Sequence, residues 1–410
     1  MAAAGPADPS SAPAPPADRL VFFFSGFDPK GAPFYHRLAR EAAAARQARG
    51  DEAVIVGGRH RVGRWASAWH LRWPADPGAG AAGDMHSHHH FMRWDDIVRR
   101  HWSRSAWQLL RDYAGVYGLG IPTGVFSRIW SKSRAAWGLA VLPLVVAMVS
   151  LTLGVGLSIA VLRHEGRVGP VAAVALGAAI GVLMWRAVVR RIDCEWLLRL
   201  YAFSRLQALG RLPALEARLD EMAAHLVETV QARQAAPGSR PLREVMLVGY
   251  STGSMVAASV LARALPRLAA PSPAGPPAIA MLSLGHCIPV GADWGAAVAF
   301  RAELQALADC PALTWHDYSA PGDWAAFWRT PPWPTPARLR GHQASPRFHR
   351  LLDPQAYAQL RRDRREMHLQ YLRAGNRPVE ASGYDYLALT AGPSTLAERH
   401  ARIAARPLPP

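Results

Sequence analysis

The stretch Arg243-Glu-Val-Met-Leu-Val-Gly-Tyr-Ser251-Thr-Gly-Ser-Met-Val-Ala-Ala-Ser-Val-Leu-Ala-Arg263 decides how the rest of the chain is interpreted. It opens with an apolar run, typical of a buried β-strand, and continues as an Ala/Leu/Val segment with helical spacing. Between the two, Gly249 and Gly253 flank Ser251 in the pattern G-x-S-x-G. A sharp strand-to-helix turn brings backbone segments close together, so both flanking positions favour glycine. Such a turn would expose the Ser251 hydroxyl and aim the N–H of Thr252 at a developing oxyanion.

Two other functions of such a turn are compatible with its composition. Strand-to-helix turns rich in glycine and serine also serve packing alone, or bind phosphate at the helix N-terminus. No lysine follows in the manner G-x-x-x-x-G-K-[ST], which disfavours a phosphate loop. The pattern therefore favours a turn that carries a nucleophile, with a packing turn as the alternative.

Length and charge narrow the class of protein. A chain of 410 residues, 50% of them hydrophobic, is long enough for one large α/β domain with insertions. The net charge of +17 suggests an anionic partner, either nucleic acid or anionic lipid. The chain has no helix-turn-helix, RNP or finger pattern, so we predict no nucleic-acid partner. Cys194, Cys287 and Cys310 form no C-x-x-C pair, which fits a reducing compartment.

The N-terminal part contains a disordered segment and the first half of the domain. Residues 1–18 are rich in Ala, Pro and Ser and are predicted to be disordered, without the features of a secretory signal. Residues 20–24 form a continuous apolar run, typical of a strand buried on both faces. A helix and a second strand at residues 53–57 follow, which predicts a right-handed parallel crossover. The loop after the first strand contains Gly26 and Phe27.

A histidine-rich segment follows an aromatic strand. Residues 65–73 alternate in the manner of an antiparallel strand, and the cluster from His86 to His90 comes next. No cysteine or ordered carboxylate accompanies this cluster, and neighbouring strand residues face opposite ways, so we predict no metal site. Residues 91–102 form a Trp- and Arg-rich helix, facing either a membrane or solvent.

Residues 131–192 are predicted to form a transmembrane hairpin. Residues 137–162 contain no charged side chain and are long enough to span a bilayer, and residues 168–185 form a second uncharged run. In the second run, Gly177 and Gly181 have the small-xxx-small spacing that lets helices pack closely. Basic residues flank both ends of the pair, which predicts that both ends lie in the cytoplasm, at the inner membrane of a bacterium. The flanking residues are Arg128, Lys132, Arg134, Arg186, Arg190 and Arg191.

The remaining chain resembles the second half of a known fold. Helices over residues 192–234 precede the Ser251 strand, and strands are expected at residues 278–285, 311–318 and 383–390. Residues 330–352 are rich in Pro and Arg and are expected to be a loop or lid. Together with the G-x-S-x-G turn and the loop 22–28, these elements resemble the α/β-hydrolase superfamily over residues 19–57 and 193–392. The motif Phe-Asp-Pro-Lys-Gly resembles a group of bacterial membrane-associated hydrolase-like proteins.

The resemblance implies a mostly parallel α/β sheet with helices on both faces, interrupted by the hairpin. The first part of this α/β domain covers residues 19–130, the second part covers residues 193–400, and residues 401–410 form a tail. It also implies a triad in the order Ser, Asp, His. Asp323 occupies the expected place after the second strand beyond Ser251, and Asp317 is the alternative. The oxyanion hole would comprise Thr252, Phe27 and Gly26.

The histidine of this triad is not obvious. No histidine follows the strand expected at residues 383–390. We favour His368, because an apolar, aromatic segment surrounds it. The alternatives are His349, His342, His286 and His400.

Two functions are compatible with this pattern. The first is a membrane-anchored serine hydrolase that acts through an acyl-enzyme on an ester, thioester or acyl-lipid, without a cofactor, on the cytoplasmic side of the membrane. The second is a membrane scaffold or binding protein that has kept the fold and lost the triad. Its partners would be the lipid bilayer and, for the enzyme, a small-molecule or lipid ester.

Overall fold

The computed structural model describes residues 17–74, 84–102, 105–164, 169–192, 194–268, 277–379 and 382–405. Residues 1–16 of the N-terminal segment predicted to be disordered lie outside the described residues. Its last two residues, Ala17 and Asp18, are buried and belong to the first strand, so the segment predicted to be disordered ran two residues too far.

One mixed, mostly parallel sheet forms the centre of the described chain. Its order is β2-β4-β5-β1-β6-β7-β8-β9, with β3 paired to β4. Every pairing from β5 to β9 is parallel, whereas β4 runs antiparallel to its neighbours. The strands are β1 (Ala17–Phe24), β2 (Ile55–Val56), β3 (His60–Val62), β4 (Ala66–Trp73), β5 (Met85–Met92), β6 (Leu242–Tyr250), β7 (Ala278–Leu284), β8 (Leu313–Tyr318) and β9 (Arg340–Ala344).

The first strand is central because both of its faces are apolar. Val21 and Phe23 face one hydrophobic core, and Phe22 and Phe24 face the other. At its two edges, strand β1 pairs with β5 on one side and β6 on the other. The second predicted strand, β2, lies at the sheet edge, where Ile55 is exposed. It pairs antiparallel with β4, which is itself antiparallel to β5. Because β5 is parallel to β1, β2 runs parallel to β1 as the crossover predicts, with β4 and β5 between them.

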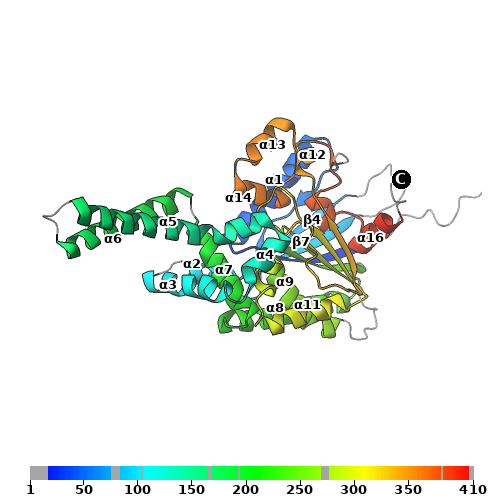
Figure 1. Ribbon diagram of the computed structural model, residues 1–410. Helices are drawn as coiled ribbons and strands as arrows, with labels where there is room; N and C mark the ends of the chain where they lie inside the picture. The colour runs from blue at the N-terminus through cyan, green and yellow to red at the C-terminus, as the bar shows by residue number, and fades with distance from the viewer. Residues whose placement is uncertain are drawn as a thin grey trace, which may run out of the picture.

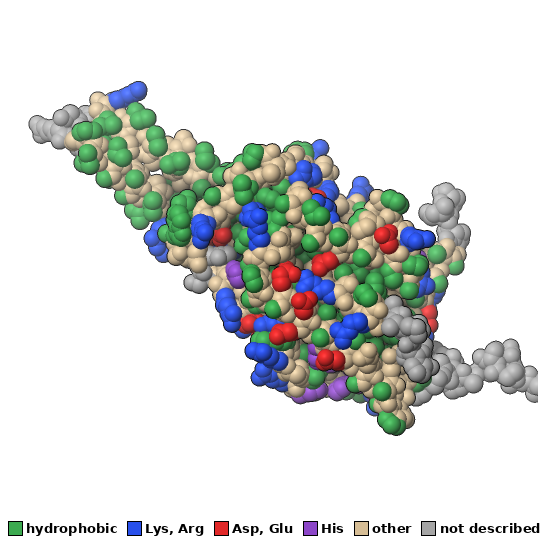
Figure 2. Space-filling model, turned by 90° about the horizontal axis from the view of Figure 1, so that it is seen from below, with side chains coloured by type: hydrophobic (Ala, Val, Ile, Leu, Met, Phe, Trp, Pro, Cys, Tyr) green, Lys and Arg blue, Asp and Glu red, His purple; other side chains and the backbone are tan. Residues whose placement is uncertain are grey.

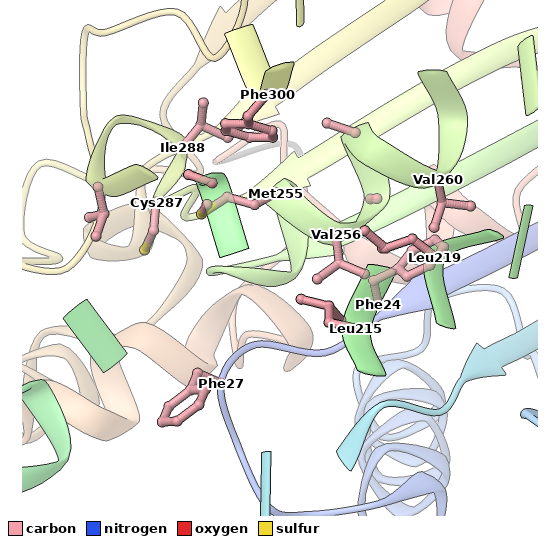
Figure 3. Packing of buried hydrophobic residues seen from close by; sticks show 14 of the residues in the cluster. Phe24, Phe27, Leu215, Leu219, Met255, Val256, Val260, Cys287, Ile288 and Phe300 are labelled. Carbon is pink, nitrogen blue, oxygen red and sulfur yellow. The ribbon is translucent and has the colours of Figure 1, made fainter. Parts of the chain in front are cut away.

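Helices cover both faces of the sheet, as Figure 1 shows. One face carries α1 (Ala32–Ala48), α12 (Phe348–Leu351), α13 (Pro354–Leu360), α14 (Arg364–Leu369), η3 (Gln370–Leu372) and α15 (Tyr386–Thr390). The other carries α7 (Glu195–Ala208), α8 (Pro213–Ala235), α9 (Gly253–Leu268), α10 (Ile288–Ala292) and α11 (Val298–Ala308). Phe24 packs there among Leu219 of α8 and Val256 of α9 (Figure 3). The predicted α/β architecture is therefore present.

Two long apolar helices project from the domain. Helices α5 (Arg134–His164) and α6 (Pro170–Ile192) are both long and apolar enough to cross a membrane. They extend away from the sheet (Figure 1), and hydrophobic side chains cover them in Figure 2. The predicted span 137–162 is shorter than α5 at both ends, whereas the predicted span 168–185 begins two residues before α6 and ends seven residues before it does. Residues 165–168 of the connecting turn lie outside the described residues.

Glycines bring the two helices into close contact. A Cβ on Gly154 would lie 2.7 Å from the carbonyl oxygen of Gly177, and one on Gly181 would lie 3.1 Å from that of Ser150. A Cβ on Gly177 would overlap the Ser158 hydroxyl. Only glycine permits this backbone approach, so the small-xxx-small spacing marks the contact face of the pair.

Short helices surround the foot of this pair. They are α2 (Asp95–Trp102), α3 (Ala106–Tyr113), η2 (Ala114–Gly118) and α4 (Val125–Lys132), with α16 (Leu396–Ala404) at the far side of the domain. Tyr113 and Tyr117 donate hydrogen bonds to the carbonyl oxygens of Pro143 and Ala140 in α5 (3.1 and 2.8 Å). The first third of α5 therefore packs on the domain, and the exposed part begins near Val145.

Two sequence-based assignments in the C-terminal part were wrong. The predicted strand 383–390 contains helix α15 instead, whose first turn is capped by Asp385 through the N–H of Ala388. The expected loop or lid 330–352 contains β9, a strand of the sheet, and α12. Strand β9 has a polar sequence because it lies at an edge, where one side needs no apolar cover.

Candidate active site

Ser251 occupies a strained turn between β6 and α9. Its φ of 59° is left-handed, a conformation that non-glycine residues rarely adopt. A Cβ on Gly249 would lie 2.9 Å from the backbone nitrogen of Ser254, and one on Gly253 would overlap the carbonyl oxygens of Phe24 and Ser25. Both glycines are therefore required by close backbone contacts. The strand, turn and helix that the sequence predicts at Ser251 are all present.

The loop after β1 packs directly against this turn. A Cβ on Gly26 would lie 2.9 Å from Cβ of Ser251 and 3.3 Å from its Oγ. The N–H of Phe27, which the sequence suggested as an oxyanion donor, donates to Oγ1 of Thr252 at 2.7 Å. Among the described residues, no backbone acceptor receives a hydrogen bond from the N–H of Thr252. The predicted oxyanion donors thus lie at the serine, but one of them is engaged by the Thr252 side chain.

His368 and Asp323 form a hydrogen-bonded pair. Nδ1 of His368 lies 2.7 Å from Oδ2 of Asp323. The same carboxylate oxygen accepts from the Tyr371 hydroxyl at 3.0 Å, and Oδ1 accepts from the N–H of Ala325 at 3.0 Å. Because a carboxylate only accepts, the proton of the neutral imidazole lies on Nδ1. Nε2 of His368 then carries a lone pair, as a general base requires.

The histidine ring lies beside the residue that precedes the serine. The rings of Tyr250 and His368 are in contact, with centroids 5.1 Å apart, and the Tyr250 hydroxyl donates to the His368 carbonyl oxygen at 3.1 Å. Nε2 of His368 is buried and has no hydrogen-bond partner in the described chain. Oγ of Ser251 lies 3.7 Å from Sγ of Cys287 and makes no hydrogen bond to the imidazole. The pair and the serine are thus neighbours that are not hydrogen-bonded to each other.

The place of His368 in the chain follows from β9. Because the predicted strand 383–390 contains helix α15 (Tyr386–Thr390), β9 is the last strand of the described sheet, and His368 follows it. Asp323 follows β8 and Ser251 follows β6, so all three come from loops or helices after the carboxyl ends of strands. The missing histidine inferred from the sequence was a consequence of the wrong strand assignment.

Comparison with protein-family models, curated proteins and solved structures finds no match. The function therefore has to be inferred from the geometry of the chain itself.

The other candidate acid belongs to a separate buried network. Asp317 is fully buried in β8 and accepts hydrogen bonds from Ser283 (2.7 Å), Ser319 (3.0 Å) and Gln343 (3.1 Å). His286 is also fully buried, 3.9 Å from Asp317, and bonds to the carbonyl oxygen of Thr330. This network stabilises the region below the active-site loops and does not include Ser251.

The remaining candidate histidines lie elsewhere. His342 and His400 both contact the ring of His316, and His349 contacts Tyr357. Among the described residues, none of the three is hydrogen-bonded to the serine.

The histidine cluster lies on β5 and faces both sides of the sheet. His88 lies 3.3 Å from the carboxylate of Asp18, and Nδ1 of His90 lies 3.4 Å from Nε2 of His225. Burial lowers the pKa of His90 to about 3, so this ring is neutral at physiological pH. Within the described parts of the chain, no group of three His, Cys, Asp or Glu side chains is arranged to hold a metal ion.

Three side chains near the site were not predicted from the sequence. Tyr371 orients the Asp323 carboxylate, Tyr250 packs on His368, and Cys287 contacts the serine. Burial raises the pKa of the Cys287 thiol to about 12, so it is neutral and a poor nucleophile. One signal in the sequence could have linked Tyr371 to the site, because it lies three residues after His368 in a helical segment.

A cleft of about 500 Å³ opens beside Asp323. One wall comes from the junction of α4 and α5, and the other from the loop after β8. The lining residues are Ser131, Lys132, Ser133, Arg134, Ala135, Pro321, Asp323, Ala326, Trp328, Arg329 and Thr330. The cleft thus joins the candidate acid to the foot of the apolar helices.

Proposed function

We propose that the chain is a serine hydrolase of the α/β-hydrolase type, anchored in a membrane through α5 and α6, that cleaves an ester or acyl-lipid. The observation that carries this proposal is the oriented His368–Asp323 pair beside a strained Ser251 turn. Among the described residues the buried Nε2 of His368 has no hydrogen-bond partner, so its lone pair is free to accept the Ser251 proton.

The sheet order supports the relationship to α/β-hydrolases. Strand β6 carries the serine and is flanked by β1, whose loop packs on the serine, and by β7. Asp323 follows the second strand beyond β6, and His368 follows the third. These are the places at which the superfamily carries its acid and its base.

The chemistry would proceed through a covalent acyl-enzyme. Oγ of Ser251 attacks the carbonyl carbon, and its proton passes to Nε2 of His368. Asp323 stabilises the imidazolium, and the N–H of Thr252 holds the oxyanion. The protonated His368 then gives its proton to the leaving alcohol as the ester bond breaks. Water hydrolyses the acyl-enzyme by the same route and restores the free serine.

Two changes complete the site for this reaction. The Ser251 side chain, whose Oγ lies 3.7 Å from the Cys287 thiol, would turn towards His368. The N–H of Phe27 becomes a second oxyanion donor when the Thr252 hydroxyl turns away. Hydrogen bonds of catalytic groups are often long before substrate binds, so the geometry without substrate does not by itself rule out catalysis.

Exposed apolar residues around the foot of the helices support the membrane anchor. Trp107 and Leu110 of α3, Ile121 and Trp130 are between 45% and 64% exposed. Tryptophan is enriched where protein meets the lipid headgroups. The free part of α5, from Val145 to Leu162, measures about 27 Å, close to the hydrocarbon thickness of a bilayer. The basic flanks support a cytoplasmic position for both helix ends and, with them, for the domain.

A fluorophosphonate probe tests the nucleophile directly. The wild-type protein in detergent is expected to become labelled at Ser251, and Ser251→Ala is expected to abolish labelling. Ser254→Ala is the matched control, because that serine lies in the same turn and donates to the Ser251 carbonyl oxygen. Labelling that persists in Ser251→Ala would refute the assigned nucleophile.

The competing proposal is a membrane scaffold with an inactive site. The engaged Phe27 N–H and the absence of a hydrogen bond between Ser251 and His368 favour it. A folded wild-type protein that the probe does not label would establish this alternative over the hydrolase.

A further inference from the structure

The cleft at the foot of α5 carries an excess of positive charge. Lys132 is paired with Asp293, so its charge is compensated. Arg134 and Arg329 are exposed, and neither is paired with a carboxylate in the described parts of the chain. The Asp323 carboxylate accepts from His368, Tyr371 and Ala325 on the inner side of the cleft. Two arginines therefore remain available for an anionic ligand.

Arg329 is held in a strained backbone conformation. Its φ of 67° is left-handed, and only Ser251 and Arg347 share positive φ among the described non-glycine residues. Glycine would relieve this strain, so an arginine there is costly for folding. Strain of this kind is frequent at ligand sites, where the position of a side chain matters more than local stability.

The position of the cleft selects between anionic ligands. Its first wall, residues 131–135, leads directly into α5. Helix α14, which carries His368, lies close to the start of α7, because the guanidinium of Arg365 is 5.8 Å from the Trp196 ring. Residues 131–135 of the cleft wall and helix α14 therefore both lie near the place where the apolar helices join the domain, as the ribbon in Figure 1 shows for α4, α5 and α14. At this depth a ligand would come from the headgroup layer of the bilayer.

We infer that this cleft binds the phosphate headgroup of an anionic membrane lipid and thereby presents an acyl ester of that lipid to Ser251. Arg134 and Arg329 bind the phosphate oxygens through charge-assisted hydrogen bonds. Trp328 covers the glyceryl part of the headgroup from the same loop. The inference rests on the proposed hydrolase function for its catalytic step, but the binding of the lipid does not depend on catalysis.

Binding is measured in the background of Ser251→Ala, so that no turnover occurs. The full-length protein in neutral detergent is titrated with phosphatidylglycerol and with phosphatidylcholine, and bound lipid is counted by native mass spectrometry. We expect phosphatidylglycerol to bind at least about tenfold more tightly, because the zwitterionic lipid brings its own cation to the arginines. Equal affinity for the two lipids would overturn the inference.

Substitutions identify the cleft as the site. Arg329→Gly and Arg134→Gln are each expected to weaken phosphatidylglycerol binding by about tenfold or more. Arg329→Gly also relieves a strained φ, so its thermal midpoint stays the same or rises, which separates lost binding from misfolding. Arg402→Gln removes the same charge from α16, on the far side of the domain, and is expected to leave affinity within about twofold. Unchanged binding in both cleft variants would refute the site.

Two further measurements separate the possible failures. Inorganic phosphate at millimolar concentration is expected not to displace the lipid, and full displacement would assign the cleft to a soluble phosphate instead. Fluorophosphonate labelling of the wild-type protein is measured in parallel. Selective lipid binding without labelling would contradict the hydrolase and support the lipid site. Labelling without lipid selectivity would contradict the lipid site and support the hydrolase.

Discussion

Replacing Asp323 by asparagine reverses the hydrogen bonding that orients His368. All three neighbours of this carboxylate are donors, namely Nδ1 of His368, the Tyr371 hydroxyl and the N–H of Ala325. An amide has one accepting atom and one donating atom, so it cannot accept from both sides. If its nitrogen faces His368, the ring has to accept at Nδ1, and its proton moves to Nε2. Nε2 then cannot receive the proton of Ser251.

The size of the effect follows from this change of tautomer. A histidine locked in the wrong tautomer loses about 10⁴ in rate in a triad mechanism, or about 5.5 kcal/mol of transition-state stabilisation. If the amide instead keeps its oxygen towards His368, its nitrogen faces the N–H of Ala325, and the fold loses about 1–3 kcal/mol. Asp323→Asn is therefore expected to reduce the rate of fluorophosphonate labelling by at least about 10³.

Asp317→Asn is the matched control, because it changes a second buried carboxylate in the same part of the sheet. Two of its three donors are the hydroxyls of Ser283 and Ser319, which can rotate and accept from an amide. We expect labelling within about threefold of wild type and a loss of stability below about 3 kcal/mol. Labelling rates are followed on gels, and folding by thermal unfolding. Unchanged labelling of Asp323→Asn, or a selective loss in folded Asp317→Asn, would refute the assigned acid.

Two further predictions concern the turn and the thiol beside it. Gly249→Ala places a methyl group against the backbone of Ser254 and is expected to destabilise the fold by about 3 kcal/mol or more. Gly58→Ala is the control, because nothing lies within 4 Å of the new Cβ, and it should change the free energy of unfolding by less than about 0.5 kcal/mol. Both variants are measured by denaturant titration. Equal losses of stability in the two variants would contradict the close contact at Gly249. Because burial raises the pKa of Cys287 to about 12, its thiolate fraction at pH 8 is only about 10⁻⁴. Alkylation of Cys287 by iodoacetamide should therefore be at least about 10³ slower than alkylation of an unfolded cysteine, and its rate should rise about tenfold per pH unit. Peptide mapping shows which cysteine is alkylated first. Labelling of Cys287 ahead of the half-buried Cys310 would contradict this prediction.

The sequence predicted the centre of the fold well because strong patterns lie there. The apolar run ending in Phe24 required a strand buried on both faces, and the glycines around Ser251 required a tight turn. The uncharged runs likewise required long apolar helices. Strand β9 was missed because an edge strand needs no apolar alternation, and its sequence contains arginine, histidine and glutamine.

The candidate site was predicted residue by residue but not as an arrangement. Asp323 and His368 are paired as expected, although an alternating segment near Tyr384 imitated a strand and made the histidine look misplaced. Local pattern cannot separate a five-residue strand from a five-residue helix when tertiary packing decides between them. The bond from the Phe27 N–H to Thr252 was also beyond prediction, because it joins loops that are distant in the sequence.

The position of α5 and α6 within the chain has a consequence for synthesis at the ribosome. Strand β1 is made first, yet one of its edges pairs with β6, which is made only after both apolar helices. Until then, β1 can pair only with β5, and its other edge offers unpaired N–H and C=O groups to any passing strand. Insertion of the two helices would hold this half-sheet at the bilayer surface, away from other nascent chains, until the second half emerges. The hairpin would then assist assembly of the sheet as well as anchor it.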